Sequence, residues 1–248
     1  QQGIGAPKPI YAHLPLILAP DKSKLSGRHG AVSVTEYQKN GYLPQALINY
    51  LALLGWNPGT EQEIFSIEEL IQSFDVSKIQ KAGAVFNIEK LNWFNKQYIS
   101  KMSDVEFSVY AKNFISKDIS NRILPLIKEK ISYFGEIEAL LNGELSFVDG
   151  VGSYDKESLK WKQEKDLINT KEYLKIIIEK LNSIDDFSKE SVKAVLWPLA
   201  EEKGKGNILW PMRYALSGKE KSPDPFIISE ILGKQETIKR LKFAHELL

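Results

Sequence analysis

The chain has 248 residues, of which 43% are hydrophobic, so it can bury a sizeable core as one large or two small domains, which excludes a disordered chain. Its 33 basic and 32 acidic side chains leave a formal net charge of +1, which confines any nucleic-acid-binding surface to a local patch. The lack of cysteine excludes disulfides and zinc sites built on thiolates, and it suits a cytoplasmic location.

The first 34 residues predict extended structure and a loop. Residues 9–20 are apolar, but their prolines block a continuous helix and favour a strand-like run. Residues 21–30 form a polar, basic loop, and the Ala-Val-Ser-Val of residues 31–34 predicts a short β-strand. The chain starts without Met or a signal peptide and contains no run of about 18 apolar residues that would predict a membrane span. We therefore expect an internal start within a longer protein.

From Thr35 onward the sequence predicts a mainly α protein. Thr35 followed by Glu36 resembles a helix start, and Gly41 resembles a stop. Pro44 opens a second helix with apolar residues at helical spacing, and Gly55 closes it. By the same criteria we expect helices over residues 66–74, 88–100, 104–115, 120–133, 135–142, 171–181, 188–202, 210–217, 225–232 and 235–247. Glycines and polar residues at 149–153 indicate a domain junction.

The segment with the clearest chemical content is Lys22-Ser23-Lys24-Leu25-Ser26-Gly27-Arg28-His29-Gly30. Such a loop can wrap a polyphosphate, because its cations neutralise charge, its glycines permit close backbone approach and a hydroxyl can donate a hydrogen bond. On composition alone, a solvated basic loop is the better interpretation. The residues that follow along the chain favour the phosphate-binding interpretation instead.

Four short motifs follow one another in a specific order. Residues 24–26 are Lys-Leu-Ser, residues 28–30 are Arg-His-Gly, residues 41–44 are Gly-Tyr-Leu-Pro, and residues 54–56 are Leu-Gly-Trp. Together they resemble the bacterial glutamyl-tRNA synthetases, in which a class I loop, typically Lys-Leu-Ser-Lys-Arg, precedes His-Gly and a Gly-Tyr-Leu-Pro helix. The resemblance continues over residues 86–95, 210–218, 222–223 and 232–234, and it is loose over about 115–191.

This resemblance implies a fold and a domain order. The fold would be mainly α, with elongated helical bundle domains behind a short β-containing N-terminal remnant. Residues 1–30 would end the class I catalytic domain and carry its loop. Residues 31–148 would form the helical stem-contact and proximal anticodon-binding region, and residues 149–248 the distal helical anticodon-binding domain.

The resemblance also implies a ligase that joins glutamate to tRNA(Glu). ATP, with Mg²⁺ expected alongside it, would activate glutamate as an adenylate, and the terminal ribose of the tRNA would then take the glutamyl group. Lys24, Ser26 and Arg28 would act in catalysis, and the same residues with Gly27 and His29 would hold the ATP phosphates. The family's glutamate pocket lies in an earlier part of the catalytic domain, so we expect no adenylate formation by this chain alone. We expect no metal site, no structurally bound cofactor, and no membrane or DNA partner.

One departure from the family pattern lies in the loop. Gly27 stands where the family has its second lysine, which removes the cation expected nearest the phosphates. Arg28 or Lys22 could substitute for it, or the protein is a specialised paralogue.

RNA contacts require exposed basic side chains for phosphates and aromatic or polar groups for unstacked bases. The candidates are Arg122, Lys128, Lys130, Lys203, Lys205 and Arg213. Lys205 and Arg213 are the stronger two, because their segments resemble the distal domain, although Arg213 could instead pack against a helix. For any single lysine, a solvated surface charge is the commoner situation. Trp56, Trp93 and Trp197 lie in apolar helical patterns, which favours core packing over base stacking.

Two alternatives from other functional classes stay open. One is a free-standing RNA-binding module, which Gly27 favours. The other is a helical interaction scaffold without synthetase activity, which the near-zero net charge favours.

Overall fold

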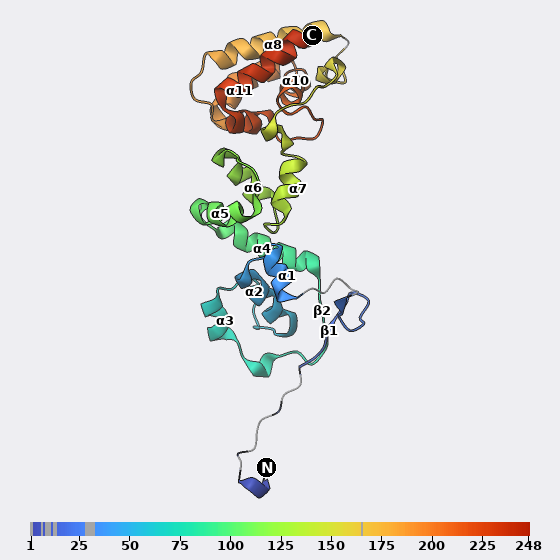
Figure 1. Ribbon diagram of the computed structural model, residues 1–248, viewed down its shortest axis with the longest axis vertical. Coiled ribbons are helices and arrows are strands. Elements are labelled where there is room, and N and C mark those ends of the chain that lie inside the picture. Colours follow the sequence, from blue (N-terminus) through green and yellow to red (C-terminus); the bar gives the residue numbers. More distant parts are fainter. Residues whose placement is uncertain (1, 6, 8–10, 12–13, 28–32, 165) are drawn as a thin grey trace. The chain divides into compact units, whose positions relative to one another are not determined.

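The computed structural model describes residues 2–5, 7, 11, 14–27, 33–164 and 166–248 (Figure 1). It is mainly α, which confirms the predicted fold class. The chain forms two compact units: unit 1 comprises Gln1–Phe114 and Lys128–Glu136, and unit 2 comprises Ile115–Ile127 and Ile137–Leu248. The expected domain limits at residues 30 and 148 coincide with neither unit boundary and stay predictions.

Unit 1 combines short helices with a very small sheet. Its elements are η1 (Gln2–Ile4), β1 (Ile17–Leu18), α1 (Val34–Lys39), α2 (Pro44–Gly55), α3 (Ile67–Ser73), η3 (Val76–Lys78), β2 (Ala84–Val85), α4 (Ile88–Lys101), α5 (Asp104–Ala111) and η4 (Lys112–Phe114). Strands β1 and β2 run parallel, with Ile17 opposite Ala84 and Leu18 opposite Val85. Helix α6 (Leu124–Lys130) and helix α7 (Glu136–Asn142) contain residues of both units.

Capping residues set the helix starts of unit 1. Ser66 and Ser103 each form a capping box with the glutamate three residues later, at the starts of α3 and α5. Ser33 caps α1 by accepting a hydrogen bond from the backbone N–H of Glu36 at 3.3 Å. Val34 is therefore helical, and the strand expected over 31–34 is wrong for its described residues, 33 and 34. Ala31 and Val32 lie outside the described residues.

The core of unit 1 lies where α2 packs against α4 (Figure 1). Its buried cluster consists of Tyr37, Tyr42, Leu47, Tyr50, Leu91 and Phe94. Two buried asparagine side chains form hydrogen bonds with backbone groups of the loops beside this core. Asn95 accepts from the Leu43 N–H at 2.8 Å and donates to the Ser132 carbonyl at 2.6 Å. Asn49 accepts from the Phe65 N–H at 2.9 Å. These bonds satisfy loop groups that helices and strands leave unpaired.

A second aromatic cluster surrounds Phe134. The rings of Phe107, Tyr110 and Phe114 lie 5.4, 5.7 and 5.8 Å from the Phe134 ring, centroid to centroid. The backbone N–H of Phe134 also donates to the Gly41 carbonyl at 3.2 Å. The tight turn after α1 is thus fixed to this cluster.

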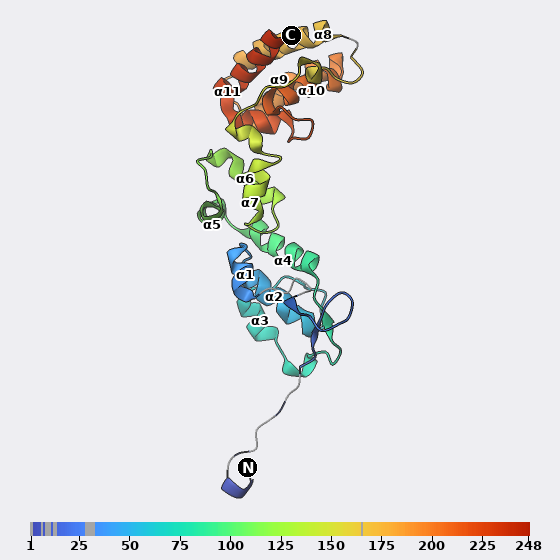
Figure 2. The same ribbon diagram turned by 45° about the vertical axis from the view of Figure 1, so that its right-hand side comes forward.

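Unit 2 is built from long helices. Its elements, besides parts of α6 and α7, are η5 (Asn121–Ile123), η6 (Ser146–Asp149), η7 (Lys156–Leu159), α8 (Leu167–Asn182), α9 (Lys189–Lys203), α10 (Lys205–Ser217) and α11 (Pro225–Leu247). Helix α11 packs against α8, α9 and α10 (Figures 1 and 2). Gly233 interrupts α11 with a positive φ of 73°, so the two helices expected on either side of it are present as two segments of α11.

Two helix predictions differ from the structure. Residues 120–133 do not form one helix, because η5 and α6 end at Lys130, and this expectation is wrong. Helix α10 begins at Lys205 rather than at Trp210, directly after the positive-φ Gly204 that separates it from α9.

The tryptophan predictions have mixed outcomes. Trp56 is 2% exposed, which confirms core packing. Trp93 is 39% exposed, so the same prediction is wrong for it. The buried positions of α4 are Leu91, Phe94, Asn95 and Ile99, and Trp93 lies beside that face. Trp197 is half-buried.

Candidate functional site

The loop that follows β1 begins with an ordered turn. The Asp21 carboxylate accepts from the Ser23 backbone N–H at 2.9 Å and from its hydroxyl at 2.7 Å. The N–H of Ala19 donates to the Ser23 carbonyl, and the N–H of Lys22 donates to the Ala19 carbonyl, both at 2.8 Å. Lys22 itself has a φ of 65°, in the left-handed region that side-chain-bearing residues seldom adopt. The turn therefore has a defined shape, and the exposed Lys22 lies in it.

Beyond this turn the chain runs back along β1. Lys24 forms an antiparallel bridge with Leu18, and the Leu25 N–H donates to the Ile17 carbonyl at 3.0 Å. Lys24 is exposed and Ser26 is half-buried. One predicted loop residue, Lys24, is therefore placed by pairing with the strand, and Ser26 directly follows the paired Leu25. Arg28 and His29, which were also predicted to hold phosphate, lie outside the described residues.

Gly27 is exposed and has room for a side chain. A Cβ atom built at this position meets no atom of the described residues within 4 Å, and its φ is not in the left-handed range. The backbone conformation therefore does not require a glycine, and the described residues leave room for a lysine side chain.

The predicted RNA-binding residues near α6 are engaged within their own units. The Lys128 ammonium donates to the Met102 carbonyl at 2.5 Å and lies 3.3 Å from the Asp104 carboxylate. Its side chain is only 17% exposed, and its ammonium group caps the C-terminal end of α4. Arg122 is exposed but donates to the Glu230 carbonyl at 3.4 Å. Lys130 is half-buried and also has an interaction partner.

The two predicted residues of α10, Lys205 and Arg213, lie against aromatic rings. The Lys205 ammonium is 4.5 Å from the centroid of the Trp197 ring, and the ammonium of Lys193 is 4.9 Å from the same ring. The Arg213 guanidinium is 4.8 Å from the Trp210 ring centroid. These are cation–π distances. Trp210 belongs to the same helix as Arg213, so this contact tests neither the packing of Arg213 against a neighbouring helix nor its role in RNA binding, and both stay predictions.

The sequence analysis did not identify Lys193 as a residue that contacts the Trp197 ring. Lys193 and Trp197 are four residues apart in α9, a spacing that brings side chains together on one helix face, and this signal was available. Lys203 forms an ion pair with Glu202 at 2.9 Å, and this hydrogen bond raises the pKa of Lys203. Lys193 and Lys205 thus combine exposed charge with the face of the Trp197 ring, and proteins bind single-stranded nucleic acids with these two features.

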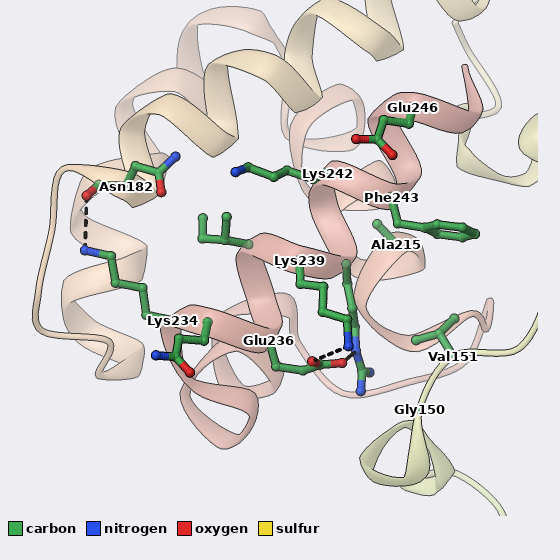
Figure 3. Close-up of a pocket in the computed structure, with 13 residues that line it drawn as sticks. Gly150, Val151, Asn182, Ala215, Lys234, Glu236, Lys239, Lys242, Phe243 and Glu246 are labelled. Carbon is green, nitrogen blue, oxygen red and sulfur yellow. Dashed lines mark hydrogen bonds and ion pairs between the residues drawn. The ribbon is translucent and has the colours of Figure 1, made fainter.

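A pocket of about 960 Å³ lies beside the C-terminal half of α11 (Figure 3). Figure 3 shows Lys242 reaching toward the side on which Asn182 lies. Several lining cations are already engaged: Lys234 donates to the carbonyls of Asn182 and Ile184 at 3.1 and 2.6 Å, and Lys239 lies 3.3 Å from Glu236. The pocket therefore offers few charges that are available to a ligand.

The described part of the chain contains neither a metal site nor a membrane-spanning helix. No group of His, Cys, Asp and Glu within it could hold a metal ion. No helix among the described residues has the length and apolar character to span a membrane.

Comparisons with known proteins place similarity over the whole chain. The model of the class I tRNA synthetase (E and Q) catalytic domain matches residues 1–93, and the model of the anticodon binding domain matches residues 80–245. The glutamate–tRNA ligase of Flavobacterium psychrophilum is 37% identical over 98% of this chain, and that of Clostridium botulinum is 36% identical over 100%. The chain spans about half the length of these relatives, 52% of each.

Solved structures give the same picture. A glutamate–tRNA ligase from Elizabethkingia meningosepticum, in complex with its amino acid, has a TM-score of 0.82 and 33% identity, and the match covers 99% of this chain and 53% of that one. A glutamate–tRNA synthetase from Elizabethkingia anophelis has a TM-score of 0.79 at the same identity, covering 99% of this chain and 52% of that one.

Proposed function

Since the chain belongs to the anticodon binding domain family and matches glutamate–tRNA ligases over its length, we propose that it is the tRNA-binding part of an enzyme that joins glutamate to tRNA(Glu). The observation that carries this proposal is the anticodon-binding match over residues 80–245. The exposed Lys205 and the half-buried Arg213, each beside a tryptophan ring, lie within it. We place the protein in the cytoplasm.

The complete enzyme would work in two steps. The glutamate carboxylate attacks the α-phosphorus of ATP, pyrophosphate leaves, and the adenylate then passes its glutamyl group to the terminal ribose hydroxyl of the tRNA as AMP leaves. Lys24, Ser26 and Arg28 would stabilise the charge that develops on the phosphates, with Gly27 and His29 lining the same loop. Mg²⁺ would accompany ATP on its phosphates. The antiparallel bridge of Lys24 to Leu18 supports this role, because it fixes one cation to a strand.

This chain alone is proposed to bind tRNA without completing the reaction. The resemblance implies that the family's glutamate pocket lies in an earlier part of the catalytic domain, and this chain spans only 52% of the length of the Flavobacterium psychrophilum ligase. Glutamate-dependent exchange of pyrophosphate into ATP should therefore be absent for the purified chain, and detectable exchange would contradict this. The same chain should bind tRNA.

Binding of tRNA to the chain should weaken steeply as salt rises. We expect Lys205→Ala to weaken binding several-fold at all anticodon sequences and to reduce the slope of log affinity against log salt by roughly 0.7–0.9, the contribution of one phosphate contact. Arg213→Ala should weaken binding as well. Fluorescence anisotropy with labelled tRNA(Glu) and a panel of anticodon variants measures both.

Lys175→Ala is the matched control for these variants. Lys175 is an exposed lysine of α8 in the same unit. Its replacement by alanine also removes one positive charge, but at a position outside α9 and α10. Its affinity and salt slope should stay close to those of the unaltered chain. Salt-insensitive or undetectable tRNA binding would instead support a protein-interaction scaffold.

Gly27 favours one second candidate, a free-standing RNA-binding module whose loop no longer serves ATP. Replacing Gly27 with lysine, in a fusion that carries the unmatched part of the Flavobacterium psychrophilum ligase ahead of residue 1, separates the two. If the loop contacts ATP, glutamate-dependent exchange should rise on the order of tenfold, the effect of one charge-assisted hydrogen bond. Gly152→Lys adds the same charge at an exposed, uncrowded glycine and should leave the rate unchanged. Equal rates for the unaltered fusion and its Gly27→Lys variant would favour the module.

A further inference from the structure

The pocket beside α11 lies wholly within unit 2. All of its lining residues come after the catalytic-domain match, which ends at residue 93. Helix α10 contributes Ala215 to the lining, and Arg213 lies two residues earlier in that helix. Since consecutive residues of an α-helix are roughly 100° apart, Ala215 and Arg213 lie on opposite sides of α10. The pocket is therefore separate from the face on which Arg213 contacts Trp210.

Most of the charges that line this pocket are neutralised by their neighbours. Lys239 and Arg240 share the Glu236 carboxylate, at 3.3 and 2.8 Å. The Lys234 ammonium donates to two backbone carbonyls and lies 3.2 Å from the Asp185 carboxylate. Because two cations share one carboxylate, the group formed by Lys239, Arg240 and Glu236 carries a net positive charge. The pocket therefore favours an anion over a cation.

The free polar groups of the pocket gather at one end. The Lys242 ammonium and the Asn182 side-chain amide have no hydrogen-bond or ion-pair partner among the described residues. Figure 3 shows Lys242 reaching toward the side on which Asn182 lies and away from Glu246, the second carboxylate of the lining. An anionic group at this end would meet an unpaired ammonium and the N–H donors of an amide.

The other end of the pocket is apolar. Figure 3 shows Val151 and Phe243 on the side away from the Lys242 ammonium. Phe243 is 52% exposed, and its ring meets the Tyr154 ring edge to face at a centroid distance of 6.2 Å. A nucleic-acid backbone needs several free cations, and among the described lining residues only Lys242 is a cation without such a partner. An apolar body joined to one anionic group fits both ends.

The pocket has a volume of about 960 Å³, which is enough for a small organic molecule. We propose that it binds a small organic anion. The aromatic or aliphatic body of this ligand lies against Phe243, and its carboxylate, phosphate or sulfonate lies against Lys242 and Asn182. Such binding is independent of any tRNA contact made by α9 and α10.

Two fluorescent probes that differ only in an anionic group test this site. Anilinonaphthalene sulfonate has an aromatic body and one sulfonate, and phenylnaphthylamine is the same body without the sulfonate. The sulfonate should bind the chain saturably at one site, with a dissociation constant below about 1 mM and roughly tenfold tighter than the uncharged probe. Lys242→Gln should remove most of this difference, whereas Phe243→Ala should weaken both probes to a similar extent.

Lys162→Gln is the matched control, because Lys162 is an exposed lysine of the same unit outside the pocket, and it should change neither affinity. Circular dichroism melts check that every variant is folded. Absence of saturable binding, or an unchanged affinity for the sulfonate in the Lys242→Gln chain, would overturn the proposal. Displacement of the bound sulfonate by tRNA would also overturn it, because an RNA would then occupy the pocket. So would displacement by equimolar inorganic phosphate, since the apolar end would then contribute nothing.

Discussion

Replacing Gly41 with alanine is expected to lower the free energy of unfolding of unit 1 by roughly 2–5 kcal/mol. Gly41 has a φ of 81°, and a Cβ atom there would lie 2.6 Å from Phe134 Cβ, 2.8 Å from Phe114 Cζ and 3.0 Å from the Gly135 nitrogen. The residue is buried against the Phe134 cluster, so these neighbours cannot move apart without disturbing it. The strain of the left-handed backbone and the overpacking of the added methyl group therefore both lower the free energy of unfolding.

Gly59→Ala separates these two costs. Gly59 has nearly the same φ, 85°, but a Cβ atom built there meets nothing within 4 Å. It should therefore cost only the strain, about 1 kcal/mol. Urea unfolding followed by far-ultraviolet circular dichroism and by tryptophan fluorescence measures both. Equal losses for the two variants would show that the Phe134 cluster yields more easily than its packing indicates.

Replacing Arg240 with methionine should have the second large effect, a loss of roughly 3–5 kcal/mol in the stability of unit 2. The Arg240 side chain is 8% exposed. Its guanidinium donates to the carbonyls of Phe147 and Leu216 at 2.8 and 2.7 Å and to the Glu236 carboxylate at 2.8 Å. Methionine retains much of the packing volume but leaves all three acceptors without this donor. Arg240 thus joins η6, α10 and α11.

The control for this change is Lys242→Met, which removes a positive charge from an exposed residue of the same helix and should alter stability by about 0.5 kcal/mol or less. Melting temperatures and urea midpoints measure both variants. Similar losses for the two would mean that the buried guanidinium contributes no more than a surface charge.

The pH dependence gives a second readout for Arg240. Burial raises the pKa of Glu236, but hydrogen bonds from Arg240 and Lys239 outweigh burial and leave that pKa below its ordinary value of 4.5. A lowered carboxyl pKa contributes stability that is present above the ordinary pKa and is lost as the pH falls through the lowered one. In the Arg240→Met variant this acid-dependent loss should be smaller.

Much of the helical structure follows from local sequence signals. Helix α2 runs from Pro44 to Gly55 as expected, since a proline at the first helical position and a terminal glycine are strong signals. The segment at residues 33–34 was predicted wrongly because the β propensity of Val34 is weaker than the capping bond that Ser33 makes. The exposure of Trp93 shows that helical spacing alone does not identify which of two adjacent aromatic residues faces the core.

The sequence predicted which kinds of residue form the candidate site, but it did not predict how their side chains and backbone are arranged. Motifs identified the cations of the loop, but the turn at Asp21 and the bridge of Lys24 depend on hydrogen bonds that composition does not reveal. The engagement of Lys128 with Met102, 26 positions apart in sequence, is a tertiary contact that no local pattern contains. The ring contact of Lys193, by contrast, could have been found from its spacing to Trp197.

The turn made by Asp21 and Ser23 bears on how tightly a nucleotide could be held. Its residues are ordered by their own hydrogen bonds, so the loss of conformational freedom there belongs to folding. A ligand that meets Lys22 and Lys24 would find this backbone preorganised, and more of the attraction between opposite charges would appear as affinity.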